Sequence, residues 1–185
     1  MNPKYILESG VKIMVELSEM KDGEYQNNEV IEKMPSRNHS FTQARITSLL
    51  SNDERFTPFV ELSLDASQTD LTQFGLKIKE EIIPDICIYP ESVGFNDEDD
   101  EQKMQKMPLL TIEILSPKQA ISDILAKFKA YFALGVKSCW LIVPSLKTVA
   151  VYSQPNHFRT FGMDATEVFD DIMDIRLPIQ KIFRR

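Results

Sequence analysis

Two carboxylates lie inside short apolar runs of the chain, where a charged side chain has no evident structural use. Asp85 interrupts the run 82–88, and Glu113 interrupts the run 109–115. Both runs have the length of a strand and are apolar at odd and even positions alike, which is typical of strands covered on both faces. An unpaired carboxylate in such a strand opposes folding by several kcal/mol. The two acidic residues therefore need a partner.

Two carboxylates on neighbouring strands repel each other unless a cation or a shared proton lies between them. A hard divalent ion held by oxygen ligands meets this need most simply, so the sequence predicts a metal site at Asp85 and Glu113. The alternative is a structural role. In that case the carboxylates accept backbone N–H bonds at strand ends, or they pair with a lysine or arginine elsewhere in the chain.

The elements that must position these residues indicate an α/β protein. A strand is expected over 29–34, and Ser36 is a helix-cap residue for a helix that ends at Leu50. Further strands are expected over 59–64, 76–78, 82–88 and 109–115. The acidic stretch 96–101 lacks the alternating ligands and central glycine of a calcium loop, and it is expected to be a solvated loop.

A second helix is expected directly after the Glu113 strand. Ser116 is its expected N-cap, Pro117 its first residue, and Gln119 lies three positions after the cap, while Gly135 ends it. Its apolar stripe consists of Ile121, Ile124, Leu125, Phe128, Tyr131 and Phe132. A hairpin of strands 138–143 and 148–152 follows, and the segment 175–179 is expected to be a late strand or irregular packing. This order predicts a mixed sheet with helices on its faces.

Composition limits the kind of protein. With 185 residues, 43% of them apolar and 26% charged, the chain is expected to form a single domain over 1–185. It shows no apolar stretch of the roughly 18 residues that span a bilayer and no signal-peptide pattern, so a cytoplasmic protein without a membrane partner is expected. Cys87 and Cys139 lie in apolar runs, which favours free buried thiols over disulfides or zinc. A net charge of −7 argues against non-specific coating of nucleic acid, although a locally basic groove would still admit DNA.

Other motifs accompany the two carboxylates. They are Glu29-Val30-Ile31-Glu32 with Met34-Pro35, Pro84-Asp85, Glu113-Ile114-Leu115-Ser116-Pro117, Asp123 with Lys127 and Tyr131, Gly135-Val136, Trp140-Leu141-Ile142-Val143-Pro144, and Val149-Ala150-Val151-Tyr152. With this set the chain resembles the PD-(D/E)xK nuclease superfamily, and within it the bacterial Uma-two family of putative restriction endonucleases. The likeness runs from about residue 28 to residue 183 and leaves 1–23 as a family-variable N-terminal extension.

The resemblance implies a restriction-endonuclease-like core with a mixed central sheet flanked by helices. It also implies an endonuclease that depends on Mg²⁺ or Mn²⁺ and hydrolyses phosphodiester bonds of nucleic acid, with DNA as the expected substrate. Asp85 and Glu113 would bind the metal, and Glu29 would be a further catalytic carboxylate, unless it is an exposed acid on an edge strand. A homodimer is implied as well, since duplex cleavage needs two sites related by a two-fold axis.

One position departs from the superfamily pattern, because Leu115 stands where a lysine is expected, two residues after Glu113. The resemblance implies that Lys127, from the following helix, replaces it as a catalytic residue. Asp123, Lys127 and Tyr131 are spaced i, i+4 and i+8, on one ridge beside the apolar stripe, so the ammonium could reach the carboxylates. The alternative is an ordinary surface ion pair between Asp123 and Lys127.

Two other functions stay open. A catalytically silent nuclease-fold protein could act as a binding or regulatory module, which agrees with Leu115 and the acidic charge, and an interaction protein could use both acids structurally. His39 is expected to be a core or interface histidine. Tyr131 and Trp140 are expected to be core aromatics with a polar tip. Lys118 and Lys129 could contact phosphate, or they could belong to a solvated helix face.

Overall fold

The fold is known from a computed structural model, which describes residues 7–8, 11–12, 35–77, 80–97 and 100–184. The chain divides into two compact units, residues 1–34 and 35–185. In the first unit, strands β1 (Leu7–Glu8) and β2 (Val11–Lys12) pair antiparallel. The strand expected over 29–34, with Glu29, lies outside the described residues.

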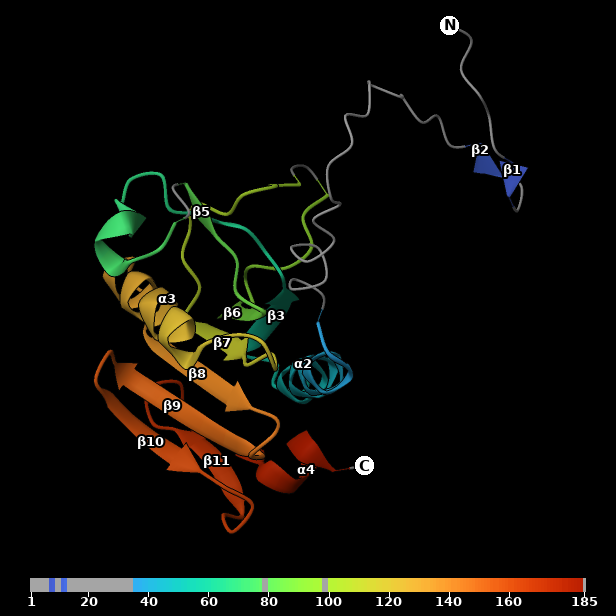
Figure 1. The fold of residues 1–185 in the computed structure, drawn as a ribbon, viewed down its shortest axis with the longest axis vertical. Coiled ribbons are helices and arrows are strands. Elements are labelled where there is room, and N and C mark those ends of the chain that lie inside the picture. The colour runs from blue at the N-terminus through green and yellow to red at the C-terminus, as the bar shows by residue number, and fades with distance from the viewer. Residues whose placement is uncertain (1–6, 9–10, 13–34, 78–79, 98–99, 185) are drawn as a thin grey trace, which may run out of the picture. The chain divides into compact units, whose positions relative to one another are not determined.

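A six-stranded mixed sheet forms the centre of the second unit, in the order β10-β9-β8-β7-β6-β3 (Figure 1). Its strands are β3 (Phe56–Val60), β6 (Ile86–Pro90), β7 (Leu110–Ile114), β8 (Ser138–Val143), β9 (Thr148–Gln154) and β10 (His157–Phe161). Strands β7 and β8 are parallel, and helix α3 (Ile121–Ala133) connects them. All other neighbours in this sheet are antiparallel. The predicted mixed sheet with flanking helices is confirmed.

Smaller elements surround this sheet. The helices are α2 (Arg37–Leu50), the 3-10 helix η1 (Leu71–Phe74) and α4 (Ile179–Phe183). Two short antiparallel pairs are β4 (Leu64–Asp65) with β5 (Glu81–Ile82), and β11 (Glu167–Asp170) with β12 (Ile175–Pro178). Strand β12 shows that 175–178 is a late strand and not irregular packing.

Two apolar cores lie on the two faces of the sheet, because successive side chains of a strand point to opposite faces. On one face Ile112 and Ile114 pack in a core with Leu50 of α2. On the other face Leu141 packs in a core with Phe128 of α3. Helices α2 and α3 therefore cover opposite faces, and they flank the sheet in Figure 1. Side chains of α2 and α3 can therefore contact residues at the end of a central strand from the two opposite faces of the sheet.

Helix α2 begins as predicted, because the Ser36 side chain accepts a hydrogen bond from His39 N at 3.2 Å. Helix α3 begins later than predicted, at Ile121 instead of Pro117, and its cap residue makes no side-chain capping bond. The Gln119 backbone N–H donates to Ser116 O at 3.0 Å, so these residues close a separate turn before the helix. Helix α3 ends before Gly135, whose φ of 99° is left-handed, as a helix stop requires.

Two of the expected strands differ from the structure. The run 59–64 is divided between β3 and β4, with Glu61 between them at φ 52°, a left-handed conformation that interrupts an extended strand. Residues 76 and 77 are not in a strand, since they directly follow the turn at Gly75 that ends η1. The other residue of that expected strand, Ile78, lies outside the described part of the chain.

The run 82–88, which contains Asp85, is also divided, because β5 ends at Ile82 and β6 begins at Ile86. Pro84 lacks a backbone N–H and cannot donate to a sheet ladder. Asp85 therefore directly precedes β6, outside the regular strand.

Three other expectations can be compared with the fold. Strands β8 and β9 form the predicted hairpin. Cys87 and Cys139 are buried free thiols, as predicted, and burial raises the pKa of Cys87 to about 12. Among the residues that the structure describes, no helix is long and apolar enough to cross a membrane.

Candidate active site

The pairing of β6 with β7 brings Asp85 and Glu113 together. In this antiparallel pair Ile86 lies opposite Ile112. Asp85 comes one residue before Ile86 and Glu113 one residue after Ile112, so the register, continued by one step, places the two acids opposite each other. Glu113 lies on β7 and Asp85 directly before β6, so the two acids are neighbours at the ends of two paired strands.

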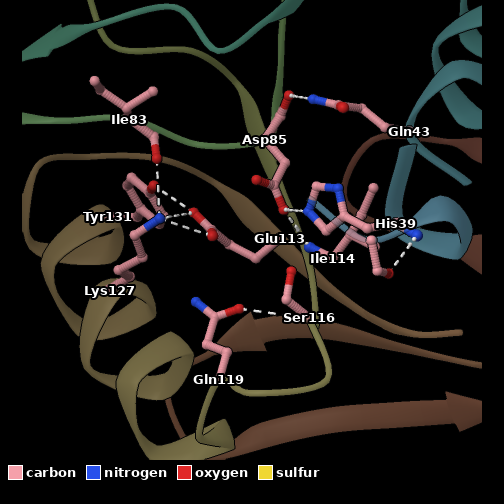
Figure 2. Close-up of polar contacts among 11 residues, drawn as sticks. His39, Gln43, Ile83, Asp85, Glu113, Ile114, Ser116, Gln119, Lys127 and Tyr131 are labelled. Atoms are coloured by element: carbon pink, nitrogen blue, oxygen red, sulfur yellow. Dashed lines mark hydrogen bonds and ion pairs between the residues drawn. The ribbon is translucent and has the colours of Figure 1, made fainter. Parts of the chain in front are cut away.

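Glu113 is buried, with 1% of its surface exposed, and α3 supplies its partners. The Lys127 ammonium donates to Oε1 and Oε2 at 2.8 and 2.7 Å, and the Tyr131 hydroxyl donates to Oε1 at 2.7 Å (Figure 2). Burial raises the pKa of the Glu113 carboxyl, and the positive charge of Lys127 opposes this shift. The same ammonium also donates to the Ile83 carbonyl oxygen at 2.9 Å, so it bridges β7 and the segment before Asp85.

The helix ridge predicted from the sequence therefore has a defined orientation. Lys127 and Tyr131 point at Glu113, while Asp123 is exposed near the start of α3, where Ser122 donates to it at 3.4 Å. Among the described residues, the acidic partner of Lys127 is Glu113 and not Asp123. Tyr131 is a core aromatic, and its polar tip belongs to this cluster.

Asp85 is held at one of its two carboxylate oxygens. Its Oδ2 accepts the Ile114 backbone N–H at 2.6 Å and the His39 Nε2 at 3.1 Å (Figure 2). No hydrogen bond from the described residues reaches Oδ1, and the side chain is 22% exposed. Asp85 thus has one fixed oxygen and one oxygen available to a ligand.

His39, which the sequence pattern placed in the core or at an interface, contacts the site. The prediction of a core or interface histidine fits its burial, at 5% exposed, but its ring nitrogen bonds to Asp85. This bond raises the pKa of His39, against an opposing effect of burial. Gln43, one turn further along α2, donates to the Asp85 carbonyl oxygen at 2.9 Å. Two polar residues four positions apart on the buried face of a helix were the available signal.

The other predicted residues lie apart from this cluster. Trp140 donates through Nε1 to Asp170 at 2.8 Å, in the core on the opposite face. Lys118 and Lys129 are exposed. Leu115 packs against the core on the α3 side, and its backbone N–H bonds to β8, so it contributes no charge.

The contacts of the two carboxylates include those expected for a structural role, namely a lysine on Glu113 and a backbone N–H on Asp85. The donor set also fits a divalent ion. Within the described ranges, no group of three or more His, Cys, Asp or Glu side chains could hold a metal. The candidate metal ligands in this part of the chain are therefore the two carboxylates of Asp85 and Glu113. Mg²⁺ is commonly bound through one or two carboxylates, and water and phosphate oxygens complete its shell. The pair fits a metal site that is open to substrate.

Comparisons with known proteins give a family. The sequence model of the Uma2 family, described as "Putative restriction endonuclease", matches residues 15–175. The fold is similar to that in the crystal structure, at 1.96 Å resolution, of "a putative nuclease belonging to DUF820" from Anabaena variabilis ATCC 29413. That match has a TM-score of 0.65 and 23% sequence identity, and it covers 81% of this chain and 82% of the other. Among curated proteins, no match was found.

Proposed function

Because this chain belongs to the Uma2 family of putative restriction endonucleases, we propose that it is a metal-dependent endonuclease that hydrolyses phosphodiester bonds in DNA. The family supports a nuclease that acts on nucleic acid. DNA as the substrate is inferred from the family's description as restriction endonucleases. Metal dependence rests on the site itself, and the observation that carries it is the pair of neighbouring carboxylates at the ends of two paired strands, with a lysine ammonium bonded to the buried one.

In this proposal Asp85 and Glu113 hold Mg²⁺ or Mn²⁺. The ion, when bound, would polarise the scissile phosphate and lower the pKa of a water molecule for attack. Asp85 contributes the exposed side of the pair through Oδ1, and Glu113 contributes the buried side. Burial of Glu113 among apolar strands strengthens its attraction for any cation that replaces or joins Lys127, since the local dielectric is low.

Lys127 takes the role of the lysine that Leu115 cannot supply. Its ammonium is fixed by Glu113 and by the Ile83 carbonyl oxygen, so its position is set before substrate arrives. With 21% of the side chain exposed, it can orient the attacking water or stabilise the charge that develops on the phosphate. Glu29 remains a proposed further carboxylate, and a two-fold homodimer a proposed assembly for cleavage of both strands.

One observation favours a second candidate function. Lys127 already neutralises Glu113 through both carboxylate oxygens, so the negative charge of Glu113 is balanced without a metal. A nuclease-fold protein of this kind could bind nucleic acid, or regulate another protein, without cutting. Such a protein would bind DNA equally well with and without divalent ions.

Metal binding and cleavage should be measured together. Mn²⁺ and Mg²⁺ are titrated by calorimetry into the wild type, Asp85→Asn and a control, Asp97→Asn, whose side chain is exposed in the acidic loop. Each protein is then incubated with supercoiled plasmid and each metal. We expect wild type and the control to bind metal and nick the plasmid, and Asp85→Asn to lose both.

The other outcomes separate the candidates. Metal binding without nicking by the wild type would indicate a missing partner, an unsuitable substrate or a disabled site. DNA binding that is equal with and without divalent ions, in the absence of nicking, would favour the silent binding protein. The absence of metal binding by the wild type would return both carboxylates to a structural role.

A further inference from the structure

Helix α2 reaches Asp85 from the face of the sheet opposite α3. Of the two site carboxylates, Asp85 is the one with an oxygen, Oδ1, that accepts no hydrogen bond from the described residues. We propose that His39 and Gln43 are positioning residues, which hold Asp85 so that Oδ1 alone is presented to the metal ion. This inference rests on the proposed function. It adds a second layer of residues, on a separate helix, behind the metal-binding carboxylate.

The position of Asp85 gives α2 a part in holding it. Asp85 lies between β5 and β6, directly after Pro84, whose nitrogen cannot donate a hydrogen bond. Its carbonyl oxygen accepts the Glu61 backbone N–H at 3.2 Å, which continues the β3–β6 register by one step, and also Gln43 Nε2 at 2.9 Å. The backbone of this residue is therefore fixed partly by a side chain of α2.

The carboxylate of Asp85 is fixed from the same helix. His39 Nε2 and the Ile114 backbone N–H both bond to Oδ2, from two different elements (Figure 2). Two donors from different elements restrain Oδ2, while Oδ1 accepts no hydrogen bond from the described residues. Because His39 and Gln43 are one helical turn apart, a single rigid element holds the backbone and the side chain of Asp85.

The chemistry of His39 argues against a purely packing role. The side chain is 6% exposed, and its Nδ1 is buried without a hydrogen-bond partner among the described residues. An unpaired buried nitrogen opposes folding, so an apolar side chain would serve packing better at this position. The bond from Nε2 to Asp85 is the contact that a leucine could not make. Partners of this kind behind a metal ligand commonly change metal affinity by about 10- to 100-fold.

The test compares two substitutions of His39 with one at the other histidine of the chain, His157, which is exposed on β10. His39→Leu removes the donor and keeps an apolar volume, and His39→Gln restores an N–H donor. Mn²⁺ is titrated by calorimetry into both variants, His157→Leu and the wild type. We expect His39→Leu to bind Mn²⁺ at least about tenfold more weakly. His39→Gln should recover most of the affinity, and His157→Leu should match the wild type.

A second measurement needs no variant and so does not depend on folding of His39→Leu. The ring nitrogens of both histidines are observed by ¹⁵N NMR in the wild type during titration with diamagnetic Mg²⁺. We expect the His39 signals to shift with metal and those of His157 to stay in place.

Each contrary result has a separate meaning. Unchanged Mn²⁺ affinity in His39→Leu, or an equal loss in His39→Leu and His39→Gln, would overturn the positioning role while the proposed function stands. His39 signals that do not move at saturating Mg²⁺ would do the same. A wild type that binds neither metal would overturn the proposed function and this inference with it.

Discussion

The Lys127 ammonium donates to both carboxylate oxygens of Glu113, at 2.8 and 2.7 Å, although the lysine is on α3 and the glutamate on β7. Glu113 is almost inaccessible to solvent, with 1% of its surface exposed. The lysine therefore supplies the positive charge that this carboxylate cannot obtain from water. Lys127 is thus the cationic partner of Glu113, whereas Asp85 is bonded to His39 and a backbone N–H.

Replacement of Lys127 by Met should harm both stability and cleavage. Glu113 would keep its burial and lose its charge partner, so we expect the free energy of unfolding of the metal-free protein to fall by about 3 kcal/mol. Loss of a fixed cation beside the phosphate should slow plasmid nicking by about 10²- to 10³-fold. Urea denaturation and a nicking assay measure the two effects, with Lys129→Met, exposed on the same helix, as the control.

Metal should compensate the stability loss in Lys127→Met. A divalent ion at Glu113 restores the missing positive charge, so we expect saturating Mg²⁺ to raise the melting temperature of this variant more than that of the wild type. Thermal denaturation with and without Mg²⁺ provides the comparison. An equal rise in both proteins would indicate that the ion and the lysine do not share the carboxylate.

Removal of the Tyr131 hydroxyl should mainly affect stability. This group is buried and donates to Glu113 at 2.7 Å, and hydrogen bonds to charged groups contribute about 1.5–3 kcal/mol. We expect Tyr131→Phe to lower the free energy of unfolding by that amount in urea denaturation. The control is Tyr152→Phe, since the Tyr152 hydroxyl makes no hydrogen bond to the described residues. Comparable losses in both variants would show that the bond to Glu113 contributes nothing specific.

The contribution of His39 to stability should depend on pH. The hydrogen bond to Asp85 raises the pKa of His39 above its usual value of 6.5, against the opposing effect of burial. A raised pKa means that the folded protein favours the protonated ring, so the stabilisation is complete below the unfolded pKa and disappears as pH rises through the folded pKa.

We therefore expect metal-free wild type to lose stability relative to His39→Gln as pH rises from about 6 to about 8. Urea denaturation of both proteins at several pH values gives this difference. A difference that grows with pH would contradict the sign of the shift.

Asp170 allows a structural carboxylate to be compared with those of the site. Its Oδ2 accepts from Ser138 Oγ at 2.6 Å and Trp140 Nε1 at 2.8 Å, and its Oδ1 accepts two backbone N–H groups. In Asp170→Asn the amide cannot accept these bonds on both sides, so we expect the free energy of unfolding to fall by about 1–3 kcal/mol. Mn²⁺ affinity should not change.

Trp140 is the sole tryptophan of the chain, so its fluorescence reports directly on the Asp170 contact. We expect the emission wavelength of Trp140 to shift in Asp170→Asn and to stay unchanged in Asp171→Asn, whose side chain is exposed. A loss of Mn²⁺ affinity in Asp170→Asn would mean that the two faces of the sheet are coupled.

Local patterns were sufficient where a single element decides the outcome. The strand around Glu113, the cap at Ser36 and the stop at Gly135 each depend on residues close together in the chain, and the structure agrees with them. The strand expected over 82–88 is divided, and Asp85 lies between β5 and β6. The start of α3 was predicted less well, because the residues that resemble a helix start adopt another local structure. Ser116 and Pro117, which resemble a helix start, form a separate turn instead.

The sequence by itself determined that two acids interrupt successive apolar runs and that a helical lysine follows them, because these features depend on apolar periodicity and spacing. Only the tertiary structure decided which partner each acid has. The β6–β7 register places Asp85 opposite Glu113, α3 brings Lys127 to one acid, and α2 brings His39 across 46 positions to the other. Such contacts depend on how helices pack on opposite faces of a sheet, and no local pattern specifies that packing.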